Sequence, residues 1–70
     1  MSLVDRMTVR QKEIVRLMTT GKRPQEIARQ LSISPWTVRT HVRNVKARVG
    51  INDTLCLVAM SAVEFNQEDT

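Results

Sequence analysis

Residues 34–49 have the sequence SPWTVRTHVRNVKARV, and this stretch predicts one amphipathic helix. Ser34 is a favourable N-cap, and Pro35 stands at the first helical position, where its missing N–H costs nothing. Gly50 follows as a C-terminal stop. The apolar residues recur at helical spacing. They form a single narrow row, the valine stripe, which consists of Val38, Val42, Val45 and Val49.

The remainder of this predicted helix is basic. It carries Arg39, Arg43, Lys46 and Arg48 and no acidic residue. A helix that is anchored along a valine stripe and positive elsewhere suits the groove of a nucleic acid. The alternative is a merely solvated basic face, which is the commoner reason for basic residues on a helix. The acid-free run and the helix-turn-helix spacing described below favour groove binding.

The charge of the chain is distributed unevenly. The 70 residues are enough for one small domain. Residues 1–49 contain all 11 lysines and arginines and three acidic residues, a formal charge of +8, whereas residues 50–70 have a formal charge of −4. This asymmetry is typical of a nucleic-acid binder whose last element has another task. We expect a flexible segment over residues 1–6, a domain over residues 7–65 and a frayed tail over residues 66–70.

Composition also limits the chemistry. The single cysteine, Cys56, cannot form an internal disulfide, which fits a reducing, cytoplasmic compartment. No Cys/His cluster indicates a metal site, and nothing in the sequence indicates another cofactor. One histidine and one cysteine do not supply the nucleophile, base and acid of an enzyme. The longest apolar run, residues 55–60, is too short to span a membrane.

Three further helices fit the apolar pattern, so the expected fold is all-α, a tetrahelical domain around a central helix-turn-helix. The first helix covers residues 9–19 and begins with a capping box of Thr8 and Gln11. Its expected inner face consists of Ile14, Leu17 and Met18, with Val15 at the edge. The second helix covers residues 24–31. Only residues 32–34 separate it from the basic helix, as in a helix-turn-helix.

The fourth helix, residues 54–64 with Asn52 or Asp53 as its cap, is apolar nearly all round. One apolar stripe consists of Leu57, Val58 and Phe65, and the other consists of Leu55, Cys56, Ala59, Met60 and Val63. A domain this small cannot bury both stripes. We therefore expect the second stripe to form a homodimer interface, and contact with a neighbouring domain is the alternative.

In their order and spacing, these residues resemble the DNA-binding domain of LuxR-type (GerE-like) bacterial transcriptional regulators. The resemblance covers residues 7–63. It is carried by Met7-Thr8, Arg10 and Glu13-Ile14 in the first helix, by Gly21, Glu26-Ile27-Ala28 and Leu31 around the second, and by Ile33-Ser34, Thr37-Val38-Arg39, His41, Asn44-Val45 and Gly50-Ile51 in the turn and basic helix. Three sites depart from the family pattern: Gln11 stands where Glu is usual, Thr54 where Arg is usual, and Arg23-Pro24 where a Ser/Thr-Asn pair is usual.

The resemblance implies a regulator's effector domain that binds a double-stranded DNA operator sequence-specifically, with residues 35–49 in the major groove and a dimer through residues 54–64. The family's base-reading positions fall on Arg39, Thr40 and Arg43. Its phosphate contacts fall on Lys22, Arg23, Thr37, His41, Asn44 and Lys46. The resemblance further implies an upstream receiver or ligand-sensing domain if the chain is a fragment, and it makes RNA polymerase a candidate partner.

Three single residues each keep two interpretations. His41 either donates to a phosphate or packs within the fold. Trp36 either packs against residues 24–31 or contacts DNA, and Cys56 is either a small apolar interface residue or a redox sensor. Two rival functions also stay open: the promoter-binding region of a sigma factor, which would act as a monomer, and a protein-interaction adaptor whose basic helix meets an acidic partner.

Overall fold

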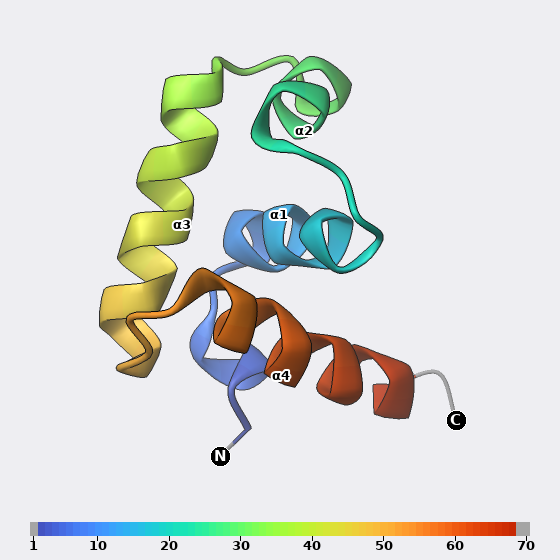
Figure 1. Cartoon of the computed structure of the whole chain (residues 1–70), viewed down its shortest axis with the longest axis vertical. Coiled ribbons are helices and arrows are strands. Elements are labelled where there is room, and N and C mark those ends of the chain that lie inside the picture. The colour runs from blue at the N-terminus through green and yellow to red at the C-terminus, as the bar shows by residue number, and fades with distance from the viewer. Residues whose placement is uncertain (1, 69–70) are drawn as a thin grey trace.

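The computed structural model describes residues 2–68, and the regular structure within them is entirely helical. A short 3₁₀ helix, η1 (Val4–Arg6), precedes four α-helices: α1 (Val9–Thr19), α2 (Pro24–Leu31), α3 (Pro35–Val49) and α4 (Thr54–Glu68). The prediction of an all-α, four-helix fold is confirmed. Figure 1 shows α3 along one side of the molecule, α2 beside its first turns, and α1 and α4 both starting near α3 and running away from it. None of the helices in the described part of the chain is long and apolar enough to cross a membrane.

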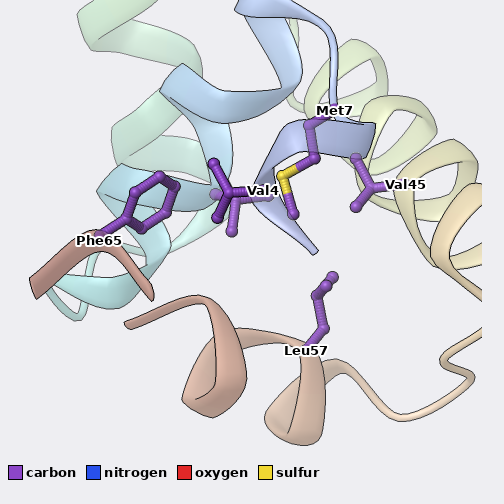
Figure 2. Close-up of a cluster of buried hydrophobic side chains, with 6 residues drawn as sticks. Val4, Met7, Val45, Leu57 and Phe65 are labelled. Atoms are coloured by element: carbon purple, nitrogen blue, oxygen red, sulfur yellow. The ribbon is translucent and has the colours of Figure 1, made fainter. Parts of the chain in front are cut away.

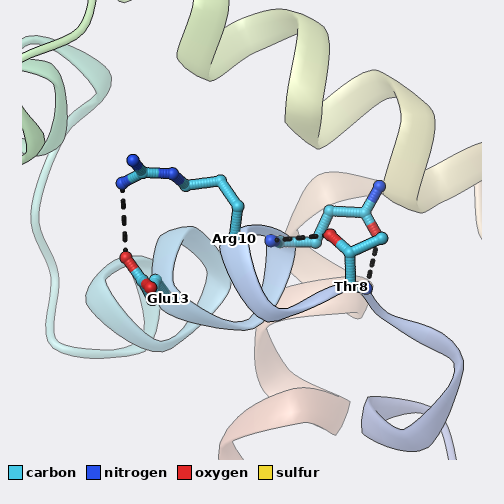
Figure 3. A network of polar contacts seen from close by, with 4 residues as sticks. Thr8, Arg10 and Glu13 are labelled. Atoms are coloured by element: carbon cyan, nitrogen blue, oxygen red, sulfur yellow. Dashed lines mark hydrogen bonds and ion pairs between the residues drawn. The ribbon is translucent and has the colours of Figure 1, made fainter.

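The start of α1 is held by the predicted capping box. The Thr8 hydroxyl accepts a hydrogen bond of 3.1 Å from the Gln11 backbone N–H, and the Gln11 side chain accepts one of 2.9 Å from the Thr8 N–H (Figure 3). On the outer side of the same helix, Arg10 and Glu13 form an exposed ion pair of 3.3 Å. Gln11 is buried, so its amide oxygen depends on Thr8 for a protein partner.

Side-chain caps also begin α3 and α4. The Ser34 hydroxyl accepts a hydrogen bond of 3.0 Å from the Thr37 N–H. Asp53 caps α4, because its carboxylate accepts a hydrogen bond of 2.8 Å from the Leu55 N–H. Gly50 ends α3 with a φ of +76°, a conformation that side chains with a Cβ rarely adopt. These contacts are local, which is why the sequence predicts the helix starts closely.

The valine stripe anchors α3 in two separate parts of the core. Val38 and Val45 are both fully buried, and they belong to different clusters. The first cluster lies between α1, α2 and α3 and comprises Ile14, Ile27, Ala28 and Val38. The second lies where the N-terminal segment, α1, α3 and α4 meet and comprises Val4, Met7, Val15, Val45, Leu57 and Phe65 (Figure 2). Each end of α3 is therefore held by a different set of partners.

The inner face of α1 differs from the prediction. Ile14 and Val15 are both fully buried, whereas Leu17 and Met18 are only half-buried. The assignment of Val15 to the edge was wrong. The physical reason is that α1 lies between the two clusters: Ile14 packs into the first and Val15 into the second.

The N-terminal segment also differs from the flexible segment expected over residues 1–6. Residues 4–6 form η1, and the Val4 side chain is only 1% exposed. The backbone N–H groups of Leu3 and Val4 donate to the Glu64 carboxylate at 2.9 and 2.8 Å. Local sequence does not predict this order, because the acceptor lies on α4 at the other end of the chain. Met1 lies outside the described residues.

Helix α4 continues one turn beyond the predicted residue 64 and ends at Glu68. Phe65 is buried in the second cluster and anchors this last part of the helix. Residues 66–68, expected to be frayed, are therefore helical. Asp69 and Thr70 lie outside the described residues.

Candidate nucleic-acid interface

Residues 32–34 form a tight turn that joins α2 to α3. Ser32 takes up the left-handed conformation, with a φ of +59°. The Ile33 N–H donates a hydrogen bond of 2.9 Å to the Ala28 carbonyl, which satisfies an acceptor in the last turn of α2. The Ile33 side chain packs against the first core cluster. The turn is thus fixed by backbone hydrogen bonding and by apolar packing, and it sets the direction in which α3 leaves α2.

Helix α2 begins without a side-chain cap from residue 23, as the poor capping ability of arginine predicts. Glu26 compensates, because its carboxylate accepts a hydrogen bond of 2.9 Å from the Arg23 N–H. The Arg23 side chain is exposed, and the Lys22 side chain is half-buried. The two residues predicted to contact phosphates here, Lys22 and Arg23, therefore lie directly before α2.

The basic side of α3 faces solvent. Arg39, Arg43 and Arg48 are exposed, whereas Val38 and Val45 on the opposite side are fully buried. Among residues 2–67, Arg39 and Arg43 have neither an ion-pair partner nor a hydrogen-bond partner. Since α3 carries no acidic residue, nothing on the helix itself neutralises this charge.

The three predicted base-reading residues lie together. Arg39, Thr40 and Arg43 line a shallow hollow of about 250 Å³ on the surface, and Trp36 is the fourth lining residue. Trp36 is 69% exposed. The interpretation in which Trp36 packs against α2 is therefore wrong, and its ring is available on the same face as the arginines.

A second hollow of about 260 Å³ lies on the other flank of the two arginines. The Lys46 ammonium donates a hydrogen bond of 3.2 Å to the Thr54 hydroxyl at the start of α4. The lining of this hollow consists of Met18, Pro24, Arg39, Val42, Arg43, Lys46 and Thr54. These residues come from all four α-helices. No single stretch of sequence therefore predicts that Met18, Pro24 or Thr54 belongs to the basic surface.

The other residues of α3 that are predicted to contact phosphates differ in their exposure to solvent. Asn44 is exposed, whereas Thr37 and His41 are half-buried. The Thr37 hydroxyl lies 2.9 Å from that of Ser34, the N-cap residue of α3, and the two hydroxyls share a hydrogen bond. His41 has no hydrogen-bond partner among the described residues. Neither hollow includes these three side chains.

The second apolar stripe of α4 is exposed. Leu55 is 81% exposed, and Met60 and Val63 are 46% and 57% exposed. Cys56 is a free, exposed thiol whose Sγ lies 3.6 Å from the Met60 sulfur. The opposite side of the helix faces the core through Leu57, Ser61 and Phe65. All the residues predicted to form the dimer interface are therefore exposed: Leu55, Cys56, Ala59, Met60 and Val63.

Comparison with known proteins identifies the domain. A family model described as "Bacterial regulatory proteins, luxR family" matches residues 5–61, which include α1, α2, α3 and the first half of α4. The chain belongs to this family. The resemblance drawn from the sequence is thereby confirmed.

Several curated relatives of the chain bear the names of transcriptional regulators. The uncharacterized transcriptional regulatory protein YhcZ of Bacillus subtilis is 38% identical over 60 residues, which are 86% of this chain and 28% of that protein. The monoamine regulon transcriptional regulator of Klebsiella aerogenes is 40% identical over 53 residues, 76% of this chain and 23% of that protein. The spore germination protein GerE of Bacillus subtilis is 38% identical over 45 residues, 64% of this chain and 61% of that protein.

The chain spans only a small part of most of these relatives. It covers 6% of three mycobacterial proteins named as putative HTH-type transcriptional regulators, at 36% identity over 56 residues. No solved structure matches the chain significantly. Membership of this family makes the chain a DNA-binding domain of the kind used in transcriptional regulation.

Proposed function

We propose that this luxR-family domain binds a double-stranded DNA operator sequence-specifically, with α3 in the major groove. The observation that carries the proposal is the outward, unpaired position of Arg39 and Arg43 on an acid-free helix that is anchored on its opposite side by the fully buried Val38 and Val45. A guanidinium can donate two hydrogen bonds to O6 and N7 of guanine, and Thr40 beside them can meet a base edge with its hydroxyl or its methyl group.

Phosphate contacts would position the helix in the groove. Lys46 borders the arginines, Asn44 is exposed on α3, and Lys22 and Arg23 stand at the start of α2. His41 and Thr37, which are half-buried on the same helix, complete the proposed set of phosphate contacts. Such contacts carry no sequence information, but they make affinity depend steeply on salt.

Dimerisation through α4 is the second part of the proposal. The face that contains Leu55, Met60 and Val63 is apolar and exposed, and burying it against the same face of another copy would form a two-fold interface. Two copies would then set two α3 helices at half-sites related by two-fold symmetry. Cys56 would serve as a small apolar residue in this contact.

The third part of the proposal concerns the larger protein to which this domain would belong, and it rests on analogy with the relatives. Because the chain covers a minor part of most of its relatives, we propose that it is the effector domain of a larger regulator with an upstream receiver or ligand-sensing domain. In that setting it acts in the cytoplasm and contacts RNA polymerase.

Selection of bound duplexes from a random library tests the proposal. A consensus with two symmetric half-sites should emerge, and the protein should prefer it over a scrambled duplex by about 10³-fold or more. The logarithm of the binding constant should fall linearly with the logarithm of salt concentration. An adaptor would show no duplex preference, and a sigma-factor-like domain would select a single site without symmetry and bind it as a monomer.

A further inference from the structure

Trp36 is a large apolar side chain that the fold does not use. It is 69% exposed at the N-terminal end of α3, whereas Val38 and Val45 on the opposite side are buried. Trp36 belongs to neither core cluster. An exposed tryptophan adds nothing to a core, and indole rings are enriched where proteins contact partners.

The surroundings of Trp36 restrict what that partner is. Trp36, Arg39, Thr40 and Arg43 are spaced at i, i+3, i+4 and i+7, so they share one face of α3, and together they line the hollow of about 250 Å³. One wall of this hollow is therefore aromatic, and two others are unpaired guanidinium groups. The occupant should combine hydrogen-bond acceptors with an apolar group placed next to them.

The major-groove edge of DNA has this combination. Guanine presents two acceptors, O6 and N7, and the C5-methyl of thymine is the one apolar group on any base edge there. We propose that Trp36 contacts the methyl group of a thymine adjacent to a base pair read by Arg39 or Arg43. This inference rests on the proposed function and adds a base preference that the arginines cannot supply.

Deoxyuridine substitution tests the proposal directly, because it removes the methyl group and leaves pairing unchanged. Each thymine of the selected operator half-site is replaced singly by deoxyuridine, and binding is measured by fluorescence anisotropy with wild-type protein and with Trp36→Ala. For the wild type, one position should weaken binding by about fourfold, the effect of one lost methyl contact. For Trp36→Ala, thymine and deoxyuridine at that position should bind equally.

Two further variants sharpen the comparison. Trp36→Phe keeps an apolar ring and should retain most of the thymine preference. Val9→Ala removes another exposed apolar side chain, 76% exposed on α1, and should retain all of it. Since Trp36 is the single tryptophan of the chain, its emission should also change on operator binding.

The outcomes separate this inference from the proposed function. If the wild type binds its operator but no deoxyuridine weakens binding, the thymine contact is wrong and groove binding stands. If Trp36→Ala binds thymine and deoxyuridine operators with the same penalty as the wild type, the ring contacts the backbone or nothing, and the inference is again overturned. If the wild type shows no preference for any duplex, the proposed function itself fails.

Discussion

Glu64 ties the first described residues of the chain to its last helix. One oxygen of its carboxylate accepts a hydrogen bond of 2.8 Å from the backbone N–H of Val4, while the other accepts one of 2.9 Å from Leu3. The Val4 side chain is buried in the second core cluster directly beside this contact. The N-terminal segment is therefore part of the domain, and it is held by an anion on α4.

Removal of this carboxylate should destabilise the domain. We expect Glu64→Ala to lower the free energy of unfolding by about 1–3 kcal/mol, because two N–H groups lose a charged acceptor. Urea denaturation followed by circular dichroism measures the change. Glu13→Ala, which removes the exposed ion pair with Arg10, is the control and should cost no more than about 1 kcal/mol. Equal losses in the two variants would contradict the structural role of Glu64.

The turn of the helix-turn-helix offers a stabilising change. Ser32 has a φ of +59°, a conformation that glycine adopts without steric cost, so Ser32→Gly should raise the unfolding free energy by about 0.5–1 kcal/mol. Ser34→Ala, two residues later, removes the cap of α3 and should lower it by about 1 kcal/mol. Thermal melts compare the two variants. A loss of stability in Ser32→Gly would show that the serine side chain has a role in the turn.

Arg43 should contribute specificity. Arg43→Ala should weaken binding to the selected operator by about 1–3 kcal/mol and relax the preference at one base pair, as expected for the loss of a bidentate contact to guanine. Arg29→Ala removes an exposed arginine on α2 and should have a much smaller effect. Anisotropy titrations with every single-base variant of the half-site provide the measurement. Unchanged affinity and an unchanged base profile would remove Arg43 from the interface.

Lys46 should contribute affinity without specificity. Lys46→Ala should weaken binding to cognate and scrambled duplexes alike and reduce the salt slope by about 1, since one phosphate contact is lost. Thr54→Val removes the hydroxyl that accepts the Lys46 hydrogen bond and leaves the charge in place, so it should retain the slope. A slope that falls equally in both variants would mean that Lys46 acts by holding α4 against α3.

A charge on the exposed face of α4 should break the dimer. Met60→Glu should give a folded monomer in sedimentation equilibrium, because pairing would bury an unpaired carboxylate. Its affinity for the two-half-site operator should fall by about 10²-fold or more, since the two half-sites would no longer be linked. Val9→Glu places the same charge on an exposed site of α1 and should leave both properties unchanged. If Met60→Glu keeps the association state of the wild type, helix α4 is not the interface.

The sequence by itself determined the features that depend on neighbouring residues. Thr8 and Gln11 begin α1, Ser34 begins α3, and Gly50 ends it, because capping groups lie within a few residues of the N–H and C=O groups that they satisfy. The valine stripe likewise faces the core, since helical periodicity places apolar residues on one side. Fold class and family followed from these local signals in combination.

Only the tertiary structure decided features that join distant segments. Val15 became a core residue because α1 packs against two clusters at once, and η1 became ordered because its acceptor, Glu64, lies on α4. The hollow that joins Met18, Pro24 and Thr54 to the arginines of α3 depended on how the other helices pack around α3. Local propensity has no access to such relationships, because their free energy comes from contacts between parts of the chain that meet only when it folds.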